Sequence, residues 1–152
     1  MVTPDPPVNS VKKAQSVAAA TAVPPGTAIT VSADPATPRI TGHYEPLRRA
    51  FSNLIRNAVE AGAGSAGIEL RASPWNQDGA EIRVIDHGPG VPRQLRGQLF
   101  EPYVTAGKAS GTGLGLALVR QAIESHGGRI RHEDTPGGGA TFVVQLPSAP
   151  RA

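Results

Sequence analysis

The sequence contains no cysteine, which excludes disulfide bonds and thiolate metal sites and fits a reducing compartment. Aromatic residues make up only 4% of the chain, and the arginines are scattered rather than gathered into a basic stripe. The usual pattern of a nucleic-acid-binding surface is therefore missing, although the net charge of +3 suits a protein that holds a polyphosphate. Since no apolar run is long enough to span a bilayer, we expect no direct membrane contact.

Glycine and proline are frequent, with 18 and 15 residues, but neither repeats at a fixed period. This excludes collagen-like and solenoid architectures. The length of 152 residues and the 39% hydrophobic content indicate one folded domain. The glycines gather in the second half of the chain, where they interrupt the apolar pattern and mark candidate binding loops.

The apolar periodicity predicts an α+β fold, in which helices cover one face of a mixed sheet to form a two-layer α/β sandwich. We expect a tail and linker helix over residues 1–27, a domain over 28–147 and a loose tail over 148–152. Residues 1–7 should lack regular structure. The expected helices cover residues 9–22, 44–61 and 113–126, and the expected strands cover residues 28–33, 68–72, 82–86, 129–133 and 140–146.

The polar face of the second expected helix carries Asn53, Asn57 and Glu60, which are spaced to project to one side. An asparagine carbonyl is a neutral oxygen ligand that suits Mg²⁺ when phosphates supply most of the negative charge. The alternative is an ordinary solvated face of a surface helix.

The strand that ends at Asp86 places this carboxylate on the same face as Ile82 and Val84, which should be buried. A buried carboxylate needs a donor partner, and the exocyclic amine of adenine is such a donor. Gly88 and Gly90 would let the backbone approach a flat base closely. The alternative is a tight turn with a capping aspartate.

A third glycine-rich segment, residues 111–115, opens the last expected helix. Free N–H groups at a helix start favour phosphate. The segment is neither a dinucleotide fingerprint, which would need glycine in place of Leu116, nor a Walker loop, because Pro102 stands where the first glycine should be. A flexible loop with a helix cap remains the alternative.

Six segments taken in order make the pattern specific: residues 53–61, 84–91, 99–108, 111–119, 125–130 and 137–147. Over about residues 28–146 the chain closely resembles the catalytic domains of bacterial sensor histidine kinases, in the superfamily that also holds gyrase, the mismatch-repair ATPases and a heat-shock chaperone ATPase. The variants at residues 57–62 and 102–105 are most similar to the nitrogen-regulation branch.

The resemblance implies ATP and Mg²⁺ as cofactors and gives each site residue a role. Asn57 matches the magnesium ligand and a catalytic residue, and Asn53 lies in the same nucleotide-binding segment. Asp86 matches the aspartate that binds the adenine amine, with Gly88 and Gly90 as its wall and Thr141 near the base. The remaining matches surround the phosphates: Lys108 as a catalytic residue in a lid over residues 92–110, and Thr105, Gly111, Gly113, Leu114 and Gly115 as binding residues.

The resemblance also implies a reaction: transfer of the γ-phosphoryl group of ATP to a histidine on a separate dimerisation domain, then to an aspartate of a response regulator. The histidines of this chain lack the acceptor motif of the family, so we expect none to be phosphorylated; His126 should cap its helix and His87 should line the mouth of the nucleotide site. The isolated domain should be a cytoplasmic monomer, from a parent protein that is either soluble or anchored in the inner membrane.

Two positions depart from the family pattern, and a third separates the chain from the ATPase branches. Glu60 stands where many members have a basic residue, Ala61 where many have an aromatic residue that stacks on adenine, and Asn53 where the ATPase branches have a glutamate base. Since asparagine is a poor proton acceptor, Asn53 favours phosphotransfer over rapid ATP hydrolysis. The alternatives are a nucleotide-binding regulatory module and an ATPase of the same superfamily.

Overall fold

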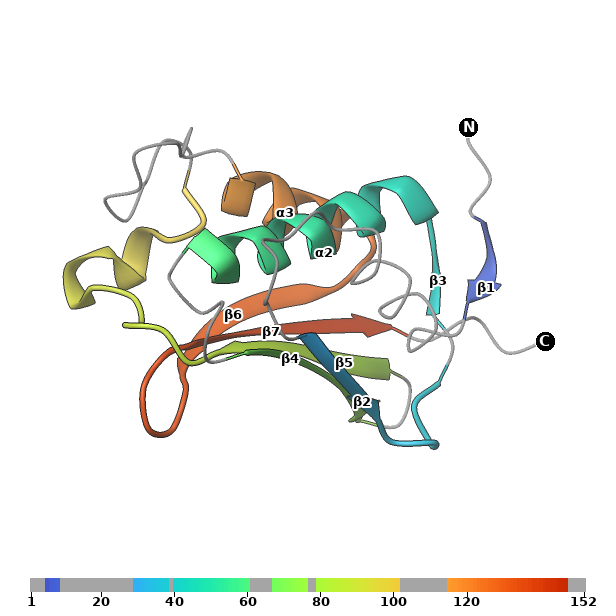
Figure 1. The fold of residues 1–152 in the computed structure, drawn as a ribbon. Helices are drawn as coiled ribbons and strands as arrows, with labels where there is room; N and C mark the ends of the chain where they lie inside the picture. The colour runs from blue at the N-terminus through green and yellow to red at the C-terminus, as the bar shows by residue number, and fades with distance from the viewer. Residues whose placement is uncertain are drawn as a thin grey trace.

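Five strands form a mixed sheet in the order β2 (Ile29–Ala33), β4 (Ile68–Trp75), β5 (Gly79–Asp86), β7 (Ala140–Pro147) and β6 (Arg129–Asp134). The computed structural model describes residues 5–8, 29–38, 40–60, 67–76, 79–101 and 115–147. β2 and β4 are parallel and the other neighbours are antiparallel. Helices α2 (Tyr44–Ala58) and α3 (Gly115–Ser125) lie on one face of the sheet (Figure 1). The expected two-layer α+β fold is confirmed.

A second, two-stranded sheet was not predicted. β1 (Asp5–Val8) pairs antiparallel with β3 (Ile40–Gly42). The expectation of no regular structure over residues 1–7 is therefore wrong for the residues of β1. Two prolines make this segment unlike a strand in local pattern, and its pairing partner lies more than thirty residues away. The expected helix over residues 9–22 lies outside the described residues.

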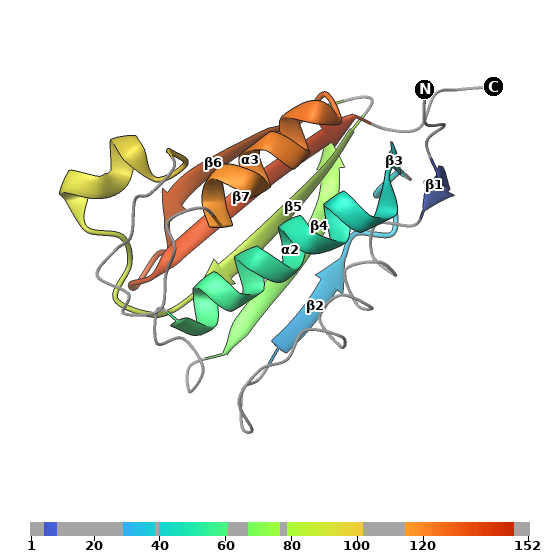
Figure 2. The ribbon, with the colours of Figure 1, turned by 90° about the horizontal axis from the view of Figure 1, so that it is seen from above.

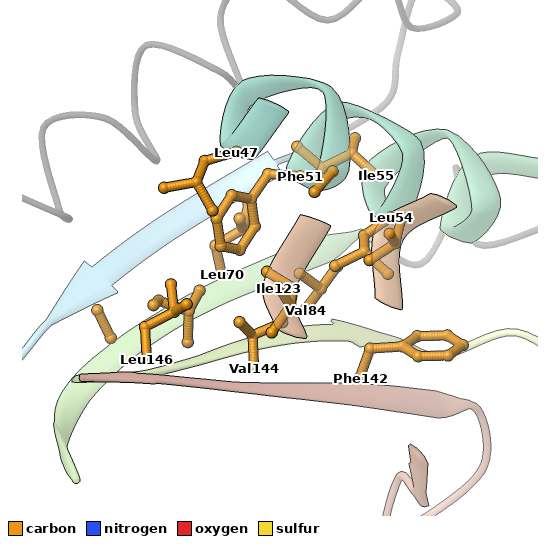
Figure 3. Packing of buried hydrophobic residues seen from close by; sticks show 14 of the residues in the cluster. Leu47, Phe51, Leu54, Ile55, Leu70, Val84, Ile123, Phe142, Val144 and Leu146 are labelled. Carbon is orange, nitrogen blue, oxygen red and sulfur yellow. The ribbon is translucent and has the colours of Figure 1, made fainter. Parts of the chain in front are cut away.

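The core lies between the sheet and the two helices (Figure 3). Along β5, Ile82 and Val84 alternate with side chains of the opposite face, as the period-two pattern predicts. The buried side chains of α2 form an apolar stripe at helical spacing, on the face that packs against the sheet. Its buried side chains are Leu47, Ala50, Phe51, Leu54, Ile55 and Ala58. Neither helix, nor any other in the described part of the chain, is long and apolar enough to cross a bilayer.

The opposite face of the sheet carries charged pairs. Arg83 contacts Glu81 of its own strand at 2.7 Å and Glu133 of β6, on the other side of β7, at 2.9 Å. Such partly exposed pairs contribute little to the free energy of unfolding. Ile85 and Val143 are also buried and have the strand parity of this face rather than of the helix-covered one. We call this side of the sheet the outer face.

A histidine joins the start of α2 to the end of α3. The backbone N–H of His43, which precedes α2, donates to Nε2 of His126 at 2.8 Å. Because Nε2 accepts, Nδ1 carries the proton of the neutral ring and donates to the Ala122 carbonyl at 2.7 Å. A Cβ at Gly42 would overlap the His126 ring, so the chain passes close beside it. The expectation that His126 caps its helix is confirmed.

Candidate functional site

Asp86 is the last residue of β5 and only 2% exposed, as its strand parity predicts. Its Oδ1 accepts a hydrogen bond from the backbone N–H of Gly88 at 3.0 Å and another from Ala140 at 3.1 Å. Two amide donors on one oxygen offset much of the cost of burying the carboxylate. Among the described residues, both hydrogen bonds to the side chain reach this same oxygen, which leaves Oδ2 for a further donor.

Two glycine segments meet beside Asp86. Gly139 has φ +118°, and a Cβ on it would overlap the backbone carbonyl of Asp86. Gly90, with φ +81°, lies against Gly139, since a Cβ on Gly90 would be 3.3 Å from the Gly139 carbonyl oxygen. The structure thus brings together Asp86, Gly88 and Gly90, as expected from the sequence. It adds Gly139 and Ala140, which the sequence pattern marked only as part of a turn and a strand start.

Two threonine hydroxyls hold the backbone of Asp86. Thr135 Oγ1 donates to the Asp86 carbonyl at 2.9 Å and lies 2.9 Å from Thr141 Oγ1. Both threonines are buried, at 6% and 4% exposed. No local signal in the sequence marked Thr135, because its two partners are separated from it by a turn and by 49 residues.

The side chains of Thr141 and His87, both expected near the nucleotide, lie away from the Asp86 carboxylate. Thr141 pairs with Ile85 and so has the parity of the outer face, and it reaches Asp86 only through Thr135. His87 is exposed, with Nε2 3.4 Å from Glu69 Oε1. Hydrogen bonds from Arg71 and then from His87 lower the pKa of Glu69. A direct contact of Thr141 with the base stays a prediction that this placement does not favour.

The other described candidates lie at the same end of the sandwich. Figure 2 shows the carboxyl end of α2, the end of β5, the start of β7 and the amino end of α3 gathered there. Asn53 and Asn57 are half-buried on α2, one turn apart, and Gly115 begins α3. Residues 102–110 of the expected lid lie outside the described residues, and so do the candidates Thr105, Lys108, Gly111, Gly113 and Leu114.

Asn57 fits the implied magnesium ion in its chemistry. Its amide oxygen is neutral, and Mg²⁺ is commonly held by one or two protein oxygens together with substrate phosphates and water. The half-buried position near the end of α2 allows a ligand contact without opening the core.

The segment after Gly90 contains a short helix that the sequence pattern did not predict. η2 (Arg93–Gln98) is a 3-10 helix without buried side chains, and it ends at the buried Leu99. Arg96 fixes it to the end of β6 through two contacts with the Asp134 carboxylate, each 3.0 Å long. Phe100 then packs edge-on against Phe142, with ring centroids 6.1 Å apart. The start of the expected lid segment is therefore anchored beside the turn that holds Asp86.

Replacing Gly139 by alanine should disturb both stability and the site. A left-handed backbone costs an L-residue about 1–2 kcal/mol, and the new Cβ would also displace the Asp86 carbonyl. The matched control is Gly137→Ala, because Gly137 has φ +86° in the same turn but open space around a Cβ. Urea unfolding should show a larger loss for Gly139→Ala. Equal losses for the two variants would contradict the close approach to Asp86.

His132 makes stability depend on pH. Its Nε2 is buried without a hydrogen-bond partner, and its ring lies 5.7 Å from that of Phe142. Burial lowers the pKa of His132 below the ordinary 6.5. The unfolded chain therefore takes up this proton at a higher pH than the folded one. The contribution of the neutral His132 to the free energy of unfolding is full above about pH 6.5, and it falls as the pH drops below that value. The charged groups around the ring are Asp134, Arg96, Asp86 and Glu133.

His132→Leu should therefore flatten the dependence of unfolding free energy on pH between about 7.5 and 5.5. At pH 7.5 the variant should be at least as stable as the wild type, because an unpaired buried polar atom costs about 1–3 kcal/mol. Leu118→Ala, at an exposed residue that does not titrate, serves as the control and should keep the wild-type slope. Parallel slopes for wild type and His132→Leu would contradict the prediction.

Comparison with known proteins matches residues 42–150 to the histidine kinase-, DNA gyrase B- and HSP90-like ATPase family. The chain belongs to this family. The match includes the segments that carry Asn57, Asp86 and the glycine turn. The resemblance to sensor-kinase catalytic domains is thereby confirmed, and the domain is of an ATPase type that binds nucleotide.

Individual relatives are sensor kinases. The sensory histidine kinase/phosphatase NtrB of Rhodobacter capsulatus is 39% identical over 130 residues, which cover 78% of this chain and 36% of NtrB. The sensor histidine kinase CpxA of Escherichia coli is 35% identical over 127 residues, or 80% of this chain and 27% of CpxA. The chain thus spans about a third or less of these relatives.

A solved structure agrees with the fold. The ATP-binding domain of PrrB from Mycobacterium tuberculosis superposes with a TM-score of 0.77 at 34% identity, covering 95% of this chain and 97% of that one. The two-layer arrangement described above is therefore that of the histidine kinase ATPase domains.

Proposed function

We propose that this domain binds Mg-ATP and transfers its γ-phosphoryl group to a histidine on a separate dimerisation domain, for onward transfer to an aspartate of a response regulator. The observation that carries the proposal is the buried Asp86 carboxylate, whose Oδ1 is held by two backbone amides at the same end of the sandwich as Asn57 and Gly115. The sensor kinases among the relatives support the same reading.

In this proposal Asp86 recognises adenine. With Oδ1 occupied by Gly88 and Ala140, Oδ2 accepts the hydrogen bond from the exocyclic amine of the base. A guanine would instead turn its O6 acceptor toward this carboxylate, so two acceptors would meet without a proton between them. The arrangement therefore selects adenine over guanine nucleotides.

Asn57 holds the phosphate end through its amide oxygen, with Asn53 one turn earlier. Bound Mg²⁺ supplies charge neutralisation across the phosphates. The residues predicted to surround the phosphates are Thr105, Lys108, Gly111, Gly113, Leu114 and Gly115. During transfer, an imidazole nitrogen of the acceptor histidine forms a bond to the γ-phosphorus as the bond to the β–γ bridging oxygen breaks, and ADP leaves.

Asn53 separates this proposal from the ATPase alternative. Hydrolysis needs a base to activate water, and an amide is a poor proton acceptor. A histidine acceptor attacks with its own nitrogen lone pair and needs no such base. The amide at this position therefore favours phosphotransfer.

The test uses this chain, the natural dimerisation domain and γ-labelled ATP. We expect label on the dimerisation domain that is stable in alkali and lost in acid, as phosphohistidine is. Release of free phosphate without labelled protein would favour the ATPase alternative. A domain that binds a non-hydrolysable ATP analogue but forms neither labelled protein nor free phosphate would favour the regulatory module.

The cellular setting is proposed on the same grounds. We infer a cytoplasmic domain that is monomeric when isolated, because the dimerisation domain lies elsewhere in the parent protein. Membership of the nitrogen-regulation branch stays a prediction from the sequence variants at residues 57–62 and 102–105.

A further inference from the structure

Thr135 lies at the centre of the contacts around Asp86. Its side chain donates to the Asp86 carbonyl. Its backbone N–H donates to the Gly139 carbonyl at 3.1 Å, and its own carbonyl accepts from Gly138 at 2.9 Å. One residue therefore closes the glycine turn and contacts the backbone of the residue that the turn surrounds.

The direction of the hydroxyl chain follows from proton counting. A threonine hydroxyl has one proton, and that of Thr135 points to the Asp86 carbonyl, which can only accept. The 2.9 Å contact between the hydroxyls must then be a donation from Thr141 to Thr135. The chain runs in one direction, from Thr141 through Thr135 to Asp86. Because all three groups are buried, solvent does not replace a lost member easily.

Asp86 is consequently held from two sides of the sheet. On the helix-covered side, the amides of Gly88 and Ala140 fix Oδ1. From the outer face, the threonine pair fixes the backbone carbonyl. Ala140 directly follows the turn that Thr135 closes, so the position of its N–H also depends on Thr135.

We propose that Thr135 is a positioning residue that sets where the Asp86 carboxylate stands, and thereby how well the site distinguishes adenine from guanine nucleotides. Thr141 supports it by directing its proton to Thr135. The inference rests on the proposed function for its ligand, while its structural part concerns Asp86 alone. It also gives Thr141 a role that agrees with its placement on the outer face.

The decisive experiment compares Thr135→Val with Thr135→Ser by calorimetric titration with ADP and with GDP. Valine keeps the shape and removes the hydroxyl, whereas serine keeps the hydroxyl. We expect Thr135→Val to weaken ADP binding about fivefold, roughly the effect of one net hydrogen bond, and to narrow the preference for ADP over GDP. Thr135→Ser should stay within about twofold of the wild type, and Thr141→Val should fall between the two.

A purely structural role would lower the melting temperature without changing the ADP to GDP preference. All titrations are therefore made at a temperature at which every variant is folded. A Thr135→Val domain that is folded and keeps the wild-type preference overturns the proposal. If Thr135→Val does not fold, Thr135→Ala replaces it, and the same comparison with serine applies.

Amide hydrogen exchange of the unliganded domain separates this proposal from the proposed function. Thr135→Val should speed exchange at the N–H groups of Gly88 and Ala140, which hold Oδ1, and Thr135→Ser should not. Unchanged exchange at both amides would overturn the positioning role. A wild-type domain that fails to bind ADP would overturn the proposed function, while the exchange result would still decide the role of Thr135.

Discussion

Replacing Asn57 by alanine is expected to slow phosphoryl transfer to the histidine domain by on the order of 100-fold. The variant loses the neutral oxygen proposed to hold Mg²⁺ against the phosphates. Alanine is the better helix former, so α2 should remain intact and the loss should lie in the chemistry. The measurement is the initial rate of labelled phosphohistidine formation at saturating ATP.

The magnesium dependence sharpens this test. Raising the Mg²⁺ concentration should recover part of the rate of Asn57→Ala, because a weakened site fills at higher concentration. Arg49→Ala, at an exposed position of the same helix, is the control and should keep the wild-type rate. An Asn57→Ala rate within threefold of the wild type would remove this residue from the metal site.

Asp86→Asn is expected to weaken binding of a non-hydrolysable ATP analogue by about 1–3 kcal/mol. The backbone donors of Gly88 and Ala140 keep an oxygen at the Oδ1 position, so the new amide nitrogen takes the place of Oδ2. That nitrogen is a donor facing the adenine amine, which is also a donor. The same nitrogen matches O6 of guanine, so the preference for adenine should narrow or reverse.

Calorimetry with the ATP and GTP analogues measures both effects. Asp34→Asn makes the same chemical change on an exposed residue directly after β2. The backbone N–H of Asp34 donates to the carbonyl of Ala72, so this residue lies beside β4 and away from Asp86. This control should bind as the wild type does. If Asp86→Asn lost the same binding free energy for both nucleotides, the carboxylate would support the fold of the site without distinguishing adenine from guanine.

Local periodicity was sufficient to predict the five-stranded sheet and the two helices between which the core lies. The strand parity of Asp86 predicted its burial, and the helical period predicted the helix over residues 44–61, where α2 lies. Both patterns are strong because one face of each element meets water and the other does not. The family segments added the order in which the site residues follow one another.

Contacts between distant segments were beyond the sequence pattern. Nothing local indicates that Thr135 reaches Asp86, since the contact depends on how β6 and β7 are joined by the glycine turn. Thr141 was expected beside the base, whereas its strand register places the side chain on the outer face. η2 was missed because it has no buried side chain and so leaves no apolar period to detect.

The hydrogen bond between His43 and His126 has a mechanical consequence. It joins α2 and α3 at the end of the sandwich opposite to Asp86, and both helices run from this joint toward the proposed nucleotide site (Figure 2). α3 has 11 residues and is therefore about 16 Å long. A rotation of about 5° at the histidine moves its amino end by about 1.4 Å, half the length of a hydrogen bond. In the proposed function, the rigidity of this remote joint sets how accurately Gly115 is placed against the phosphates.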